Sequence, residues 1–280
     1  MKILTQHPLS VGPAILLLSL ALTACGRGAA SQAAPGPSSA LDLPPIHVEQ
    51  TEELRKDGAV VDEKNYRVAW TNCQAIPNVP KKPLDEDVAR KLGRTYYQLW
   101  YAGQRLAVRS DHWTFKPDSM CQFSPVRQSD MAIVGPEGAQ LIDLTAHTSH
   151  FDPNVRLQPR AAAVPADDDE ALRAKVQAQL QQQGYGAAMA QSQGAGTEAG
   201  QPCRRFKDAT SESCVWSGGD QWGFGASAGV GVVSWSDYAL ALRMEPVDRG
   251  DGQYLTTQRM TVGQPFDRHV FDKPSGLADK

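Results

Sequence analysis

The feature that most constrains the fold of this chain is a set of short apolar segments that meet in pairs at glycine-containing turns. Along a strand, side chains point alternately to two faces, so paired segments that alternate in polarity predict antiparallel hairpins. For the first pair, a helix that continues through Leu99 is the alternative, because short apolar runs suit both structures. The three pairs lie in residues 96–109, 131–144 and 238–262.

Two other segments, residues 65–75 and 83–93, lie before the first predicted hairpin. Residues 65–75 (NYRVAWTNCQA) are interpreted as a strand that carries Cys73. A helix is expected to begin at Pro83, because proline and acidic residues favour the first turn, and to end at Gly93. Its apolar stripe would consist of Leu84, Val88 and Leu92.

Composition divides the chain into regions. Residues 26–45 are rich in Ala, Gly, Ser and Pro, so we assign residues 25–48 to a flexible tether and 49–280 to one β-rich domain. A low-complexity insertion is expected at about 158–200, with a marginal helix over 167–183. The formal net charge is −3 and no basic patch or stripe occurs, so we expect no nucleic-acid partner.

The first twenty-five residues resemble a bacterial lipoprotein leader. A basic start and a short apolar run, too short to span a membrane as a helix, precede Leu22-Thr23-Ala24-Cys25. These four residues are similar to the lipobox, which implies cleavage of residues 1–24 and lipid on Cys25. An ordinary secretory signal is the alternative. The resemblance implies a lipid-anchored envelope protein, and Gly26 after the cysteine favours the outer membrane, with the protein facing the periplasm.

Four cysteines remain after Cys25. An even number in an exported chain predicts two disulfides, and three pairings are possible. We favour Cys203–Cys214, which closes a short loop, and therefore Cys73–Cys121. No C-x-x-C motif supports a redox or metal site instead.

One segment matches a catalytic motif without its structural context. Residues 225–229 (GASAG) fit the G-x-S-x-G nucleophile elbow around Ser227, and His269 follows. That motif needs a buried strand before it and a helix after it, whereas both flanks here are glycine-rich or strand-like. We therefore keep a serine hydrolase as a remote alternative and otherwise expect no catalytic residue.

Other candidates for chemistry are equally isolated. The group formed by Asp143, His147, His150 and Asp152 could suggest zinc, but on a strand the two histidines would point to opposite faces. No phosphate loop occurs. We expect neither a metal nor a cofactor. The aromatic residues could line a ligand pocket, but core packing and strand pairing are the commoner explanation for any one of them.

The arrangement of the middle and the end of the chain resembles a known superfamily. Residues 96–109, the LIDL segment within 132–144, a strand beginning at Cys203, and F-x-x-P-x-G within 267–276 are similar to the Lol-type lipoprotein carriers and their secreted relatives. This resemblance, which covers roughly residues 60–276, implies an unclosed antiparallel barrel over helices, with an apolar cavity for acyl chains. No functional residue is carried over by position.

These patterns together predict an α+β, β-dominated fold: a curved antiparallel sheet or half-barrel with one or two helices. We expect a non-enzymatic envelope lipoprotein that binds a hydrophobic small molecule or an envelope component. Candidate lining residues are Tyr238, Leu240 and Leu242, which share one face of a strand, although side chains alone could fill that face. The alternative is a protein-binding module, such as an assembly factor or an inhibitor of a wall-degrading enzyme.

Overall fold

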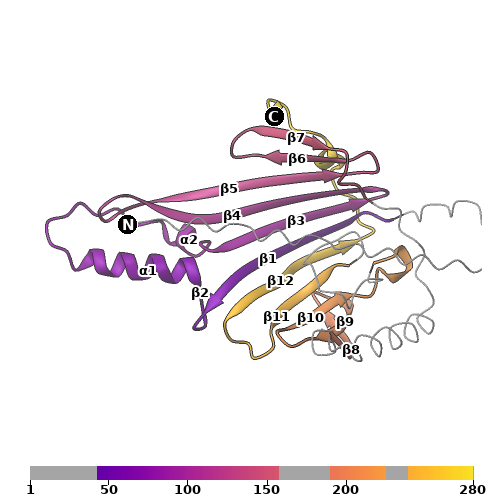
Figure 1. Ribbon diagram of the computed structural model, residues 1–280, viewed down its shortest axis with the longest axis horizontal. Coiled ribbons are helices and arrows are strands. Elements are labelled where there is room, and N and C mark those ends of the chain that lie inside the picture. Colours follow the sequence, from indigo (N-terminus) through magenta and orange to yellow (C-terminus); the bar gives the residue numbers. More distant parts are fainter. Residues whose placement is uncertain (1–42, 158–189, 225–238, 280) are drawn as a thin grey trace, which may run out of the picture. The chain divides into compact units, whose positions relative to one another are not determined.

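A computed structural model describes residues 43–157, 190–224 and 239–279 (Figure 1). One thirteen-stranded sheet runs through this part of the chain, in the order β13-β7-β6-β5-β4-β3-β1-β12-β11-β10-β9-β8, with β2 paired to β1. Every adjacent pair is antiparallel except β13–β7. The predicted β-dominated fold with a curved antiparallel sheet and two helices is therefore confirmed.

The elements follow one another along the chain as strands with two α-helices and two short 3-10 helices. The first half comprises β1 (Ile46–Lys56), β2 (Ala59–Val60), α1 (Val61–Gln74), α2 (Glu86–Ala89), β3 (Arg94–Ala102), β4 (Arg105–Ser119) and β5 (Gln122–Val134). The rest comprises β6 (Ala139–Asp143), β7 (Thr148–Asp152), β8 (Gln191–Glu198), β9 (Gln201–Lys207), β10 (Ser211–Trp216), η2 (Asp220–Trp222), β11 (Ala241–Pro246), β12 (Gly252–Val262), η3 (Arg268–Phe271) and β13 (Ala278–Asp279).

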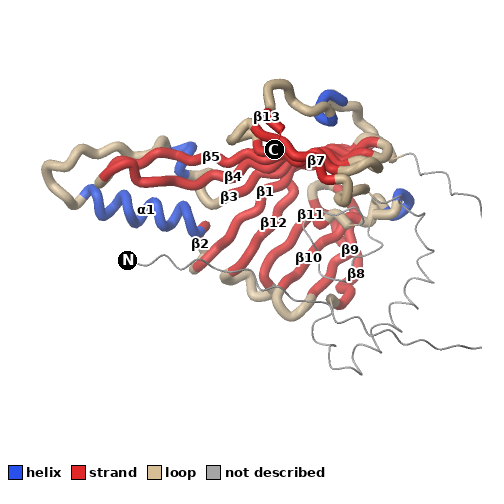
Figure 2. The backbone as a smooth tube through the Cα atoms, turned by 45° about the horizontal axis from the view of Figure 1, so that its top comes forward, coloured by secondary structure: helices blue, strands red, loops and turns tan. Residues whose placement is uncertain are grey.

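The sheet curls so that one face is concave (Figure 2). β10 and β3 are separated by three strands in the sheet order. Nevertheless Phe224, which follows η2, packs edge-on against Tyr101 of β3 with ring centroids 5.2 Å apart, and it also contacts Trp216 of β10 at 5.0 Å. The largest core cluster therefore joins strands from both halves of the sheet across the concave face.

The three predicted hairpins are present as β3–β4, β5–β6 and β11–β12. In the first, Gly103 lies at the turn with φ of +56°, a conformation that glycine adopts without steric cost. The helical alternative through Leu99 is wrong, because Leu99 lies inside β3 and is fully buried. The strand propensity of the aromatic residues and burial on both faces of β3 explain why the strand forms here.

Residues 65–75 form most of helix α1, so the prediction of a strand there was wrong. Asp62 and Glu63 lie in the first turn, where the helix dipole favours negative charge. Tyr66 and Cys73 are buried and lie seven residues apart, which places them on one helical face. Trp70 packs on the same cluster. The helical spacing of these three residues was overlooked in the strand prediction.

Helix α1 covers a projecting arm of the sheet, formed where β4 and β5 extend beyond their neighbours (Figure 1). Tyr66 contacts Phe115 of β4 and Phe123 of β5, each edge-on with centroids 5.5 Å apart. Cys73 at the end of α1 is bonded to Cys121 in the β4–β5 turn, with Cα atoms 5.3 Å apart. The arm is thus held by an aromatic cluster and one covalent link.

The helix predicted from Pro83 is shorter than expected. Helix α2 spans Glu86–Ala89 only, and Asp85 caps it by accepting a hydrogen bond from the Asp87 N–H at 2.9 Å. Leu84 lies before the helix, where its N–H donates to the Tyr66 hydroxyl at 2.8 Å. The helix ends at Ala89 and not at Gly93 as predicted; Gly93, with φ of +69°, lies in the turn that leads into β3.

The folded region differs from the predicted boundaries at two places. Ordered chain begins before residue 49, because Ile46 and Val48 belong to β1 and are fully buried. Within the predicted insertion, residues 191–198 form β8 and pair with β9. The expected helix over 167–183 and the tether through residue 42 lie outside the described residues.

The convex face carries two smaller clusters. Helices α1 and α2 cover the arm, and the segment after β12 covers the other end. There Phe271 packs with Trp100 and Ala107, and the Arg105 guanidinium lies 4.9 Å from the Phe271 ring centre. Between these covers, the convex face is polar.

The two disulfides follow the pairing that we favoured, Cys73–Cys121 and Cys203–Cys214. We predict that Cys73→Ala/Cys121→Ala lowers the free energy of unfolding by about 4 kcal/mol, because the link closes a loop of 48 residues in the unfolded chain. Urea unfolding followed by tryptophan fluorescence measures the difference. As a control, both proteins are also unfolded after full reduction. If the free energies of unfolding of the two reduced proteins still differ, packing rather than the cross-link is responsible.

Candidate functional site

The concave face is organised as rows of cross-strand neighbours, because the pairing register fixes which side chains lie side by side. The first row is entirely apolar and lies under Trp216 and Phe224, in the largest core cluster. We call this region the closed end. Its row consists of Ile46, Tyr101, Leu106, Val134 and Ala139, paired in that order across β1, β3, β4, β5 and β6.

The second row is apolar from β1 to β6, ends at His150 of β7, and becomes more exposed along its length. Val48, Leu99 and Val108 are buried, whereas Leu141 is 39% exposed. Val108, Ala132 and Leu141 line a cavity of about 390 Å³, within the range of small-molecule sites. We call this cavity the concave groove. The row consists of Val48, Leu99, Val108, Ala132, Leu141 and His150.

The third row is polar and forms the other side of the concave groove. Asp130 of β5 and Asp143 of β6 are direct cross-strand partners, so two carboxylates project side by side. Asp130 accepts a hydrogen bond from Gln128 Nε2 at 3.1 Å, and Asp143 caps the next turn by accepting from the backbone of residues 145 and 146. The row consists of Gln50, Tyr97, Ser110, Asp130, Asp143 and Thr148.

Tyr97 connects the apolar and polar sides of the concave groove. Its ring packs on the central core cluster, and it also lines the groove. Burial, followed by the nearby Glu52 carboxylate, raises the pKa of the Tyr97 hydroxyl above its ordinary value. The hydroxyl therefore remains protonated throughout the neutral range.

Gln50 lies directly opposite Tyr97 and is only 1% exposed. Its Nε2 donates to the Ala241 carbonyl at 2.7 Å and to Thr257 Oγ1 at 3.0 Å. Its Oε1 is buried and has no hydrogen-bond partner. Buried polar atoms normally have a hydrogen-bond partner, so this oxygen without a donor is an exception.

The sequence-predicted lining residues lie elsewhere. Leu240 and Leu242 have no exposed surface and pack in the closed end, while the concave groove is lined by other residues. The predicted alternation holds, because Ala239 faces a different cluster with Phe206 and Val215. Tyr238 lies outside the described residues.

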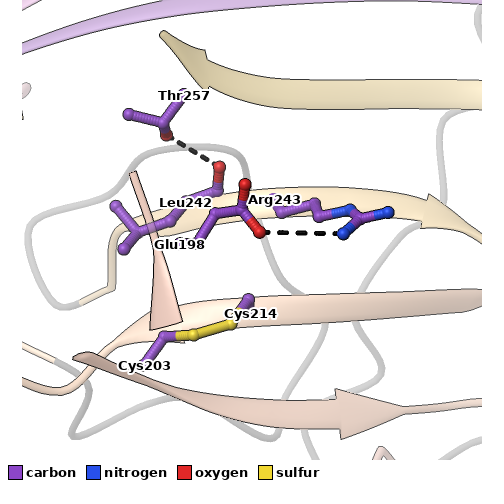
Figure 3. The surroundings of a disulfide bond; sticks show 6 residues. All are labelled: Glu198, Cys203, Cys214, Leu242, Arg243 and Thr257. Carbon is purple, nitrogen blue, oxygen red and sulfur yellow. Dashed lines mark hydrogen bonds and ion pairs between the residues drawn. A yellow bond between two sulfur atoms is a disulfide. The ribbon is translucent and has the colours of Figure 1, made fainter. Parts of the chain in front are cut away.

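The Cys203–Cys214 disulfide belongs to the same closed end (Figure 3). It joins β9 to β10, with Cα atoms 5.5 Å apart, beside Leu242 of β11. The Thr257 hydroxyl donates to the Leu242 carbonyl at 2.7 Å, and Arg243 forms an ion pair with Glu198 at 3.7 Å. These contacts hold β8–β12 together and shape the wall opposite the concave groove.

The remaining sequence candidates do not form a centre for chemistry. Ser227 and Cys25 lie outside the described residues. Among the residues that the structure describes, no three His, Cys, Asp or Glu side chains come close enough to hold a metal ion. His147 lies in a turn with φ of +54°, and His150 is exposed beside Leu141. His269 contacts Asp272 at 2.8 Å on the surface.

The polar middle of the convex face contains a second cavity of about 530 Å³. Its main side chains neutralise one another. Arg94 of β3 donates to Glu53 of β1 at 3.0 Å and to Glu63 of α1 at 2.8 Å. The Glu53 side chain is only 11% exposed. We interpret this network as a structural tie between α1 and the sheet, so the concave groove remains the better candidate site.

We predict that Arg94→Met lowers the free energy of unfolding by about 2 kcal/mol, because it leaves the largely buried Glu53 carboxylate with one fewer partner. Chemical denaturation measures the change. Arg90→Met is the matched control: Arg90 is 66% exposed and pairs only with Glu86, so its loss should cost less than about 0.5 kcal/mol. Equal losses for both variants would contradict the structural role of Arg94.

Sequence reasoning placed Val108 and Leu141 in hairpins but missed the concave groove. Alternation along each hairpin showed that these side chains share a face. The register between separate hairpins, which aligns Val108, Ala132 and Leu141 in one row, carries no local signal in the sequence. The site could not be found without that register.

The fold and groove define a class of protein with a large, open, curled β-sheet and a groove on its concave face. No protein-family model matches the chain, and no curated protein matches it. Among solved structures, the chain is similar to an uncharacterized conserved protein from Thermus thermophilus, with a TM-score of 0.35 and 5% identity, over 85% of this chain and 90% of that chain. A likeness this distant carries no argument about function.

Proposed function

We propose that this protein is a lipid-anchored envelope lipoprotein that binds a hydrophobic ligand in the concave groove. The observation that carries the proposal is the apolar row formed by Val108, Ala132 and Leu141 beside an open cavity of about 390 Å³. Apolar walls with a few polar groups are typical of small-molecule sites. The groove borders the closed end, so a ligand would continue the hydrophobic core outward.

The proposed anchor rests on the sequence alone. The lipobox-like segment that ends at Cys25 supports lipidation, outer-membrane placement and a periplasm-facing domain. Within the described residues, no helix has the length and apolar character needed to cross a bilayer. Stable anchoring through lipid requires two or more acyl chains, as on a lipoprotein cysteine.

We predict that the protein, secreted to a bacterial periplasm with its disulfides intact, binds the apolar dye N-phenyl-1-naphthylamine with a rise in dye fluorescence. Leu141→Glu should weaken this binding at least about tenfold, because a charge would enter an apolar wall. Leu141 is already partly exposed, so the variant should fold, and its unfolding midpoint verifies this.

Two comparisons make this test specific. Ala132→Trp should block the concave groove by volume, whereas Lys116→Trp, on the exposed arm, should leave dye binding unchanged. Native mass spectrometry of the same preparation should show an added mass that extracts into organic solvent. Unchanged dye binding in both groove variants would overturn the proposed site.

A second candidate function, a protein-binding envelope module, is favoured by one observation. The tip of the cross-linked arm exposes 66% of Met120 and 36% of Ile76, and α1 exposes 54% of Val68. Exposed apolar residues on a rigid support are typical of contact surfaces.

If the protein binds a partner through the arm, we predict that photo-crosslinking in intact cells detects that partner. Met120→p-benzoylphenylalanine should then trap one dominant envelope protein after illumination. Val155→p-benzoylphenylalanine, at a residue that is 43% exposed elsewhere, is the control and should trap none. The same products from both positions would reject the alternative.

A further inference from the structure

We infer that the ligand of the concave groove is an amphiphile with a positively charged head, such as a long-chain amine, and this inference rests on the proposed function. The concave groove contains an apolar row and, at the next same-face position along each strand, a polar row. An amphiphile that lies across these rows would place its hydrocarbon on Val108, Ala132 and Leu141. Its head would then lie at Asp130 and Asp143.

The two aspartates give the polar side of the concave groove negative charge. Asp130 and Asp143 face each other directly across β5–β6, an arrangement that costs stability unless a cation relieves it. The residues that line the concave groove include no lysine or arginine. Their hydrogen bonds come from the Gln128 amide and from backbone N–H groups, so neither carboxylate is neutralised by an ion pair in the described chain.

A third carboxylate lies close to the polar row. After burial, Glu52 raises the pKa of the Tyr97 hydroxyl, so a further negative charge lies near this residue of the concave groove. The acidic side chains at this end of the concave groove therefore favour a ligand head that carries positive charge and donates hydrogen bonds.

The geometry separates this region from the convex cavity. There, Arg94 bridges Glu53 and Glu63, so these two carboxylates share a guanidinium partner within 3.0 Å. The contrast shows that the fold supplies cations where carboxylates have a structural role. At Asp130 and Asp143 it supplies none among the described residues, and a bound ammonium group would provide the missing charge.

Three probes of equal chain length test the inference on the whole mature protein. Decylammonium, decanol and decanoate are titrated by calorimetry below their aggregation concentrations at neutral pH. We expect decylammonium to bind at least about tenfold more tightly than decanol, and decanoate to bind most weakly. A tenfold ratio corresponds to about 1.4 kcal/mol. The preference should decrease at high salt, because counterions screen exposed charges.

The variant Asp130→Asn/Asp143→Asn removes both charges but keeps the acceptor oxygens that receive the Gln128 and turn hydrogen bonds. It should lower decylammonium affinity about tenfold and leave decanol binding unchanged. Asp87→Asn/Glu137→Gln also removes two charges, from exposed residues outside the concave groove, and should change neither affinity.

Each outcome has one meaning. Equal binding of decylammonium and decanol, or tighter binding of decanoate, would overturn the cationic head while leaving the hydrophobic groove supported. Failure of all three probes to bind would overturn the proposed function itself. An equal loss of decylammonium affinity in the control variant would show that net charge, rather than the two aspartates, governs binding.

Discussion

The contact between Phe224 and Tyr101 is the constraint on which the rest of the described fold depends. It brings the end of β10 onto β3 although three strands separate them in the sheet. Because aromatic side chains bury large areas, a few such contacts stabilise the curl of a sheet that would otherwise have no second layer on this face. The curl creates a concave face, and only part of that face is filled by side chains.

This partial filling explains why the groove lies where it does. At the closed end, Trp216, Phe224, Leu240 and Leu242 occupy the space above β1, β3 and β4. One row further, the neighbours of Val108 and Ala132 leave room for a ligand. The same alternating strands therefore produce a packed core at one end and a groove at the other. The closed end is filled because these four side chains lie over it.

Much of the fold could be predicted from the sequence, because hairpins are local. Alternation around Gly103 identified β3–β4, and cysteine spacing identified the favoured disulfide pairing. Residues 65–75 were misassigned because a helix with only Tyr66, Trp70 and Cys73 on its inner face owes its stability to tertiary packing on the arm. The candidate site could not be predicted as a whole. The Asp130–Asp143 pair belongs to the predicted β5–β6 hairpin, but its alignment with Ser110 depends on the register between two separate predicted hairpins, which no local pattern encodes.

An open sheet also has edges, and the strand at one of them, β8, is unusual in composition. Its sequence, QSQGAGTE, contains no large apolar residue, and most of its side chains are exposed. A foreign strand that paired with such an edge would gain backbone hydrogen bonds but would bury almost no hydrophobic surface. An edge of this composition therefore favours separate molecules over aggregated ones.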